Sequence, residues 1–105
     1  MKCLITQYGK LVFLDKIISI EIIDSKDYYT GDMEHFAKEY ESILIATDVN
    51  DNEIFLGEYK DYFSCEDVRD NIALWASTDN ELDYYVVMID DPTLYPLCHE
   101  IKKKQ

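Results

Sequence analysis

The chain is rich in residues that could bind a metal ion, with twenty-two Asp and Glu residues, three cysteines and two histidines. Asp48, Asn50 and Asn52 are spaced like the first ligands of a calcium-binding EF-hand loop. The match then fails, because Glu53 stands where that loop needs glycine and Tyr59 where it needs a bidentate glutamate. The residues are typical of a hairpin turn instead. Since the cysteines and histidines also lack the spacing of zinc ligands, we predict no metal site and no cofactor.

Residues for nucleophilic or acid–base catalysis form no known motif. The glycines, Gly9, Gly31 and Gly57, are too far apart for a phosphate-binding loop, and no serine stands in a G-x-S-x-G elbow. The pair Glu34-His35 is not part of an H-E-x-x-H motif. Pairs of carboxylates could act as acid and base, but twenty-two acidic residues produce such pairs by chance. We therefore predict no catalytic residues and no enzyme activity.

The charge of the chain is strongly negative and unevenly distributed. The formal net charge is −12, and residues 27–91 carry eighteen acidic and three basic side chains, a net charge of −15. Three of the ten basic residues form the run 102–104, within a predicted basic tail at residues 102–105. Binding to nucleic acid or to an anionic membrane requires a basic face. We therefore expect neither as a direct partner.

The length and composition predict a single domain over residues 1–105. With 48% hydrophobic residues, a chain of 105 residues can bury a core without a metal or a disulfide. No apolar run approaches the ~20 residues that cross a bilayer, and the first residues do not resemble a signal peptide. Cys3, Cys65 and Cys98 form no C-x-x-C motif and cannot all pair, which favours reduced thiols and a cytoplasmic location.

Alternating apolar residues predict most of the secondary structure. Strands are expected over residues 2–7, 11–14 and 17–23, with Ile18, Ile20 and Ile22 on one buried face. Strands 42–49 and 53–59 should form a hairpin whose turn is Asn50-Asp51-Asn52, and residues 84–89 should form a last strand.

Apolar residues spaced three and four apart predict one amphipathic helix, which begins at Ser64 as its N-cap. Its buried stripe should comprise Cys65, Val68, Ile72, Trp75 and Ala76. Because strands outnumber helices without β-α-β alternation, we predict an α+β fold. Its expected form is a curved antiparallel sheet of five to six strands with one packed helix. A reduced half-barrel like that of pleckstrin-homology domains is one such arrangement.

Residues 24–41 interrupt the strand pattern and combine acidic residues with tyrosines. Gly31 predicts a turn, and Asp32 is expected to cap a short helical turn. Segments of this length between strands are often functional, although an idle insertion explains the pattern as well. The candidate partner-binding residues are Asp27, Tyr28, Tyr29, Asp32, Glu34, Glu39 and Glu41.

Two functions are compatible with an acidic, tyrosine-rich surface. Carboxylates arrayed densely on one face can imitate the phosphates of nucleic acid, and tyrosines supply rigid contact area at interfaces. Such a protein would occupy the basic nucleic-acid-binding surface of another protein. The alternative is a generic accessory interaction domain whose acidic surface only keeps it in solution.

Three sequence features resemble those of a known group of small proteins. They are the opening Met1-Lys-x-Leu-Ile-Thr-Gln7, the strand start Asp15-x-Ile17, and the hairpin strand Ile54-x-Leu-Gly-x-Tyr59 before a helix. Over residues 1–76 the chain resembles small acidic proteins of Gram-positive bacteria and of their phages and mobile elements. The 24–41 segment and the residues after Pro92 depart from them. The resemblance carries no catalytic residues, and it implies a setting in which acidic proteins inhibit host nucleases, as anti-CRISPR proteins do.

Overall fold

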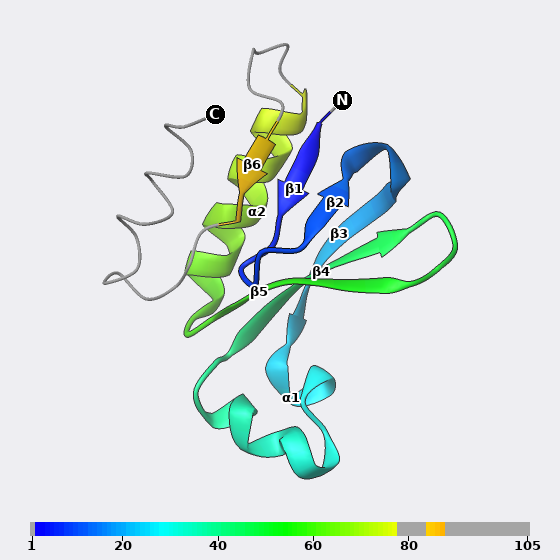
Figure 1. Ribbon diagram of the computed structural model, residues 1–105. Helices are drawn as coiled ribbons and strands as arrows, with labels where there is room; N and C mark the ends of the chain where they lie inside the picture. Colours follow the sequence, from blue (N-terminus) through cyan, green and yellow to red (C-terminus); the bar gives the residue numbers. More distant parts are fainter. Residues whose placement is uncertain (1, 78–83, 88–105) are drawn as a thin grey trace.

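The computed structural model describes residues 2–77 and 84–87 of the chain, and Figure 1 shows their arrangement. The predicted basic tail and residues 88–89 of the predicted last strand lie outside this part. The elements are, in chain order, β1 (Cys3–Ile5), β2 (Leu11–Phe13), the 3-10 helix η1 (Leu14–Lys16), β3 (Ile17–Asp24), α1 (Ser25–Tyr28), the 3-10 helix η2 (Gly31–Lys38), β4 (Ser42–Asp48), β5 (Glu53–Tyr59), α2 (Tyr62–Ser77) and β6 (Tyr84–Val86). None of the helices in the described residues is long and apolar enough to cross a membrane.

The strands form two sheets of three rather than one sheet of five to six. Strands β3, β4 and β5 make an antiparallel sheet with β4 in the middle. In the other sheet β1 pairs antiparallel with β2 and parallel with β6. The parallel pair is possible because α2 carries the chain across before β6 returns beside β1 (Figure 1). The α+β class is confirmed, the single antiparallel sheet is wrong, and the described residues form no closed barrel.

The main core lies between α2 and the two sheets. Helix α2 buries Cys65, Val68, Ile72 and Trp75, as the spacing predicted, with Ala76 half-buried beside them. The sheets and Val87, which directly follows β6, contribute the other buried residues of this cluster, which are Leu4, Val12, Leu44, Ala46, Leu56, Tyr59, Tyr85 and Val87.

The start of α2 corrects the sequence prediction. The helix begins at Tyr62, and Asp61 rather than Ser64 caps it. One Asp61 oxygen accepts a hydrogen bond from the backbone N–H of Ser64 at 2.8 Å, and the other accepts from the Ser64 hydroxyl at 3.1 Å. Asp is at least as good an N-cap as Ser, and its carboxylate also suits the positive end of the helix dipole.

The hairpin of β4 and β5 forms as predicted. At its turn, one Asp48 carboxylate oxygen accepts hydrogen bonds from the backbone N–H groups of Asn50 at 2.8 Å and Asn52 at 2.9 Å. These bonds favour the charged form and lower the pKa of Asp48. Asp51 takes the left-handed conformation with φ +63° that closes the turn.

Two irregularities in the larger sheet decide which side chains face the core. In β3, Ile17 pairs with Asp48 and Ser19 with Thr47, so Ile18 has no partner opposite it and is 62% exposed. The expectation that Ile18 shares the buried face of Ile20 and Ile22 is therefore wrong, because a bulge shifts the strand by one residue.

Strand β5 carries the second irregularity. Leu44 pairs with Gly57 and Ile45 with Phe55, so the extra residue is Leu56. Since a bulge reverses the alternation of side chains, Leu56 and Tyr59 both enter the main core although they are three residues apart. Phe55 packs with Ile45 on the opposite face of the sheet.

The 24–41 segment forms a separate lobe, coloured cyan in Figure 1, at the end of the larger sheet away from β1, β2 and β6. Its ends are held together because the backbone N–H of Ser25 donates to the carbonyl of Glu41 at 2.9 Å. The short helix η2 begins at Gly31 after Thr30, so the expectation that Asp32 caps it is wrong. Gly31 supplies the φ of +61° at this corner, a conformation that glycine adopts without strain.

Candidate functional site

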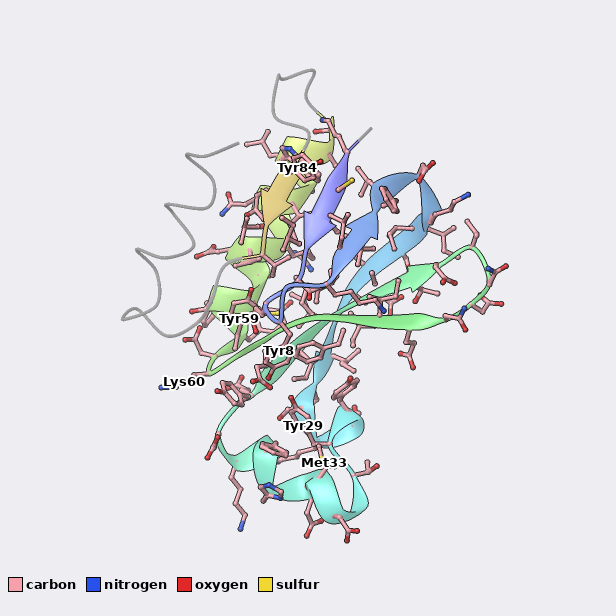
Figure 2. The ribbon with its side chains drawn as sticks, in the orientation of Figure 1. Tyr8, Tyr29, Met33, Tyr59, Lys60 and Tyr84 are labelled. Carbon is pink, nitrogen blue, oxygen red and sulfur yellow. The ribbon has the colours of Figure 1, made fainter. Side chains whose placement is uncertain are left out.

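A pocket of about 400 Å³ opens between the lobe, β5 and the β1–β2 turn, on the sheet face opposite α2. Figure 2 shows Tyr8 reaching it from the β1–β2 turn and Tyr29 and Met33 from the lobe. The lining residues are mostly aromatic, with two acids among them: Tyr8, Tyr28, Tyr29, Met33, Phe36, Glu39, Tyr40, Phe55 and Glu58. We call this the aromatic pocket.

Glu58 is held at the pocket by the side chain of Gln7. The Glu58 backbone N–H donates to Gln7 Oε1 at 2.8 Å, and Gln7 Nε2 donates to the Glu58 carbonyl at 3.3 Å. The backbone N–H of Gln7 also donates to the carbonyl of Leu56 at 2.9 Å. These bonds dock the β1–β2 turn on the bulge of β5 and link the two sheets at this point.

Stacked and tilted rings form the walls of the aromatic pocket. Tyr8 stacks on Phe55 with ring centroids 5.4 Å apart and an interplanar angle of 18°. Tyr28 lies 5.7 Å from Phe55 and meets Tyr29 edge to face at 5.1 Å, while Tyr29 lies 5.3 Å from Phe36. Such pairs add to the burial free energy of the rings and keep the walls in place.

Two phenols donate hydrogen bonds to the same carboxylate. The Tyr8 hydroxyl donates to Glu58 Oε1 at 2.9 Å, and the Tyr29 hydroxyl donates to Glu58 Oε2. Desolvation, then the hydrogen bond to Glu58 and its negative charge, raise the pKa of Tyr8 to about 12. The same causes raise the pKa of Tyr29, and desolvation with nearby acids raises that of Tyr28. Both donors therefore stay protonated and neutral near neutral pH.

The structure brings together three of the seven predicted partner-binding residues. Tyr28, Tyr29 and Glu39 line the aromatic pocket, and Tyr29 is buried at its base. The other four, Asp27, Asp32, Glu34 and Glu41, are exposed on the lobe and do not line it.

The sequence reasoning missed the residues outside the 24–41 segment that complete the pocket. Tyr8 and Glu58 are 50 positions apart in the chain, and Phe55 and Glu58 share a face only because of the bulge. One signal was present in the sequence. Gly57 stands inside a strand, where glycine often marks a bulge or a close approach of another segment.

Groups for other chemistry are sparse near the pocket. Within residues 2–77 and 84–87, no three His, Cys, Asp or Glu side chains are placed to hold a metal ion. The side chains of Cys3 and Cys65 are both buried, and Cys65 belongs to the main core. The pocket itself offers carboxylate acceptors and aromatic faces, which together suit the binding of a positively charged group.

Comparison with known proteins identified no relative of the chain. No family model matches the chain, and neither curated proteins nor solved structures show a significant similarity to it.

Proposed function

We propose that this chain is a non-enzymatic acidic interaction protein that binds a protein partner with a basic surface. The observation that carries the proposal is the exposure of five acidic residues of the lobe and their lack of ion-pair partners within the part of the chain that the structure describes. All are exposed, and among the described residues none forms an ion pair within 4.0 Å; they are Asp27, Asp32, Glu34, Glu39 and Glu41. Carboxylates without internal counter-charges can be neutralised by the lysines and arginines of a partner.

In its specific form, the proposal is that the partner is a nucleic-acid-binding enzyme of a host bacterium, such as a CRISPR effector nuclease. The chain would be a phage or mobile-element inhibitor that occupies the nucleic-acid site. The 24–41 segment carries six acidic residues against two lysines. Exposed carboxylates that outnumber the neighbouring lysines can imitate the phosphates that a basic cleft binds, and long-range attraction would speed the encounter.

Charge reversal in the lobe tests the proposal. The variant Asp27→Lys, Asp32→Lys, Glu34→Lys changes three exposed residues that do not line the aromatic pocket. A matched control, Asp15→Lys, Glu21→Lys, Asp67→Lys, changes the net charge equally at exposed positions outside the lobe. The unmodified chain and both variants would be used to capture proteins from a nuclease-treated bacterial lysate.

We expect the unmodified chain and the control to capture a nucleic-acid-binding enzyme and to inhibit its activity, whereas the lobe variant loses at least about tenfold in affinity, equivalent to ~1.4 kcal/mol. Capture should also weaken steeply between ~0.1 M and ~0.5 M salt, because ions screen exposed charges. Binding that survives the lobe reversal, or that salt does not weaken, would contradict the proposal and favour a generic accessory domain that docks through another face.

A further inference from the structure

We propose that the aromatic pocket is a receptor for one guanidinium group, supplied by an arginine side chain on the basic partner. The inference rests on the proposed function and names the group that this pocket recognises. It assigns a role to Tyr8, Phe55 and Glu58, which lie outside the acidic lobe.

The charge of the pocket selects a cation. Glu39 and Glu58 are two of the nine described residues that line it, and none of the nine is basic. The Tyr8 and Tyr29 hydroxyls remain protonated, since their pKa values are raised, so they do not contribute negative charge of their own. An anion would meet two carboxylates here, and no described lining residue supplies a compensating positive charge, so the pocket disfavours acidic ligands.

The carboxylate of Glu58 retains acceptor capacity for a ligand. Its two oxygens accept one phenol each, Tyr8 at Oε1 and Tyr29 at Oε2. Each carboxylate oxygen offers about two lone-pair sites, so one site on each oxygen remains. A carboxylate with an open site on each oxygen can accept both N–H donors of a guanidinium group, a pairing that the single point charge of an ammonium group does not make.

The walls of the pocket favour a flat cation. Tyr8 and Phe55 lie nearly parallel, and Tyr28 is tilted by 36° against Phe55, so several ring faces border the same space. A guanidinium group stacks on such faces as well as being attracted by their negative electrostatic potential. The volume of about 400 Å³ lies within the range of sites for small ligands and exceeds what one side-chain terminus needs.

The Glu58 carboxylate is already held in position before a ligand binds. Gln7 holds the Glu58 backbone, and the two phenols hold its carboxylate, so little side-chain freedom remains to be lost on binding. A site that is ordered in advance binds more tightly than a flexible one with the same contacts.

The test uses small probes in place of the partner. N-acetyl-arginine methylamide, the neutral citrulline analogue of the same shape and the lysine analogue would each be titrated into the ¹⁵N-labelled chain. Amide shifts of Tyr8, Phe55 and Glu58 report the pocket, and the indole of Trp75, which is buried in the main core, reports the fold. We expect the arginine probe to saturate with a Kd on the order of millimolar, and the citrulline probe to bind at least about tenfold more weakly.

Two pocket variants and one control complete the experiment. Glu58→Gln should weaken the arginine probe about tenfold or more, since a hydrogen bond to a charged group is lost. Phe55→Leu, which leaves Glu58 in place, should weaken it about two- to fivefold through lost stacking. Asp67→Asn removes one charge from exposed α2 surface and should change nothing.

Equal binding of the arginine and citrulline probes, tighter binding of the lysine probe, or pocket shifts unaffected by Glu58→Gln would each overturn the inference. Failure here is distinguishable from failure of the proposed function. If the arginine probe does not bind while charge reversal in the lobe still abolishes capture of the partner, only the pocket inference is lost. If the probe binds and charge reversal has no effect, the proposed function is lost instead.

Discussion

The side chain of Gln7 lies directly against the Cα of Gly57. A Cβ placed on Gly57 would be 2.7 Å from Gln7 Cδ and 2.9 Å from Gln7 Nε2, closer than non-bonded atoms approach. This contact joins the β1–β2 turn to the bulged strand β5, because the same Gln7 amide exchanges hydrogen bonds with the backbone of Glu58. A side chain at position 57 would therefore displace the amide of Gln7, a neighbour far away in the sequence.

The first prediction concerns this contact. Gly57→Ala should lower the free energy of unfolding by about 1–3 kcal/mol, because the added methyl displaces Gln7 and breaks its bonds to Glu58. In a Gln7→Ala background the same change should be neutral or stabilising by about 0.5–1 kcal/mol, since alanine is better than glycine inside a strand. Urea unfolding of the four proteins in this double-mutant cycle measures the difference. Equal costs of Gly57→Ala in both backgrounds would show that the contact is not responsible.

The second prediction concerns the ionisation of Tyr8, whose pKa is raised to about 12. In Glu58→Gln the pKa of Tyr8 should fall toward the ordinary value near ~10, because the negative charge is removed and any remaining hydrogen bond is to a neutral amide oxygen. Titration of ¹³Cζ-labelled tyrosine measures it, and Tyr8→Phe assigns the resonance. Because Tyr8 is 74% exposed, water screens part of the effect. An unchanged pKa of Tyr8 in Glu58→Gln would show that the Glu58 carboxylate does not accept a hydrogen bond from the Tyr8 hydroxyl.

The same shift has a consequence for stability, which forms the third prediction. The pKa of Tyr8 is higher in the folded chain, at about 12, than the ordinary ~10 expected after unfolding. Its contribution to stability is therefore complete below about pH 10 and is lost as the pH rises through about 12. The free energy of unfolding should decline over this range, and less steeply in Tyr8→Phe. If the free energy of unfolding declines equally with pH in both proteins, Tyr8 does not contribute to this pH dependence.

The fourth prediction concerns Lys2 at the end of α2. Its Nζ donates to the carbonyl of Trp75 at 2.6 Å and lies 5.2 Å from the Trp75 ring centroid. A cation at this place satisfies a terminal carbonyl, complements the helix dipole and attracts the indole face. Lys2→Met should cost about 1–2 kcal/mol of stability. The control, Lys26→Met at an exposed position of α1, should cost little. Urea unfolding of both variants, followed by the fluorescence of the single tryptophan, measures the two losses of stability.

The fifth prediction concerns the turn between β4 and β5. Asp51 has φ +63°, a conformation that costs free energy for residues with a Cβ. Asp51→Gly should raise the midpoint of thermal unfolding, with a gain of about 0.5 kcal/mol. Asn50→Gly, at a neighbouring position without positive φ, should be neutral or destabilising. A stabilisation of equal size at both positions would point to a cause other than backbone conformation.

Much of the fold could be predicted because its signals are local. The buried stripe of α2 follows from the spacing of residues such as Val68 and Ile72 along one helix. The β4–β5 hairpin follows from two apolar strands around Asn50-Asp51-Asn52. In both cases the partner residues are close in the chain, at most 17 positions apart in the hairpin, where Ser42 pairs with Tyr59, so a single sequence carries the information.

The bulges and the second sheet could not be predicted in the same way. Alternation places Ile18 on the buried face with Ile20, and the structure exposes Ile18 because the pairing shifts between Ile17 and Ser19. The parallel pairing of β1 with β6 joins residues that are about 80 positions apart. Nothing in either strand alone specifies which neighbour it takes, since pairing depends on how α2 packs.

The amino-acid sequence by itself determined the α+β class, the acidity and the concentration of acids and tyrosines in residues 24–41. Only the tertiary structure decided that Tyr8 and Tyr29 meet on the carboxylate of Glu58. The physical reason is that these three side chains come from three separate segments of the chain, and their meeting depends on a bulge in β5 and on the Gln7–Gly57 contact. Composition can therefore indicate an acidic interaction surface, whereas a pocket requires the packing of segments distant in the chain.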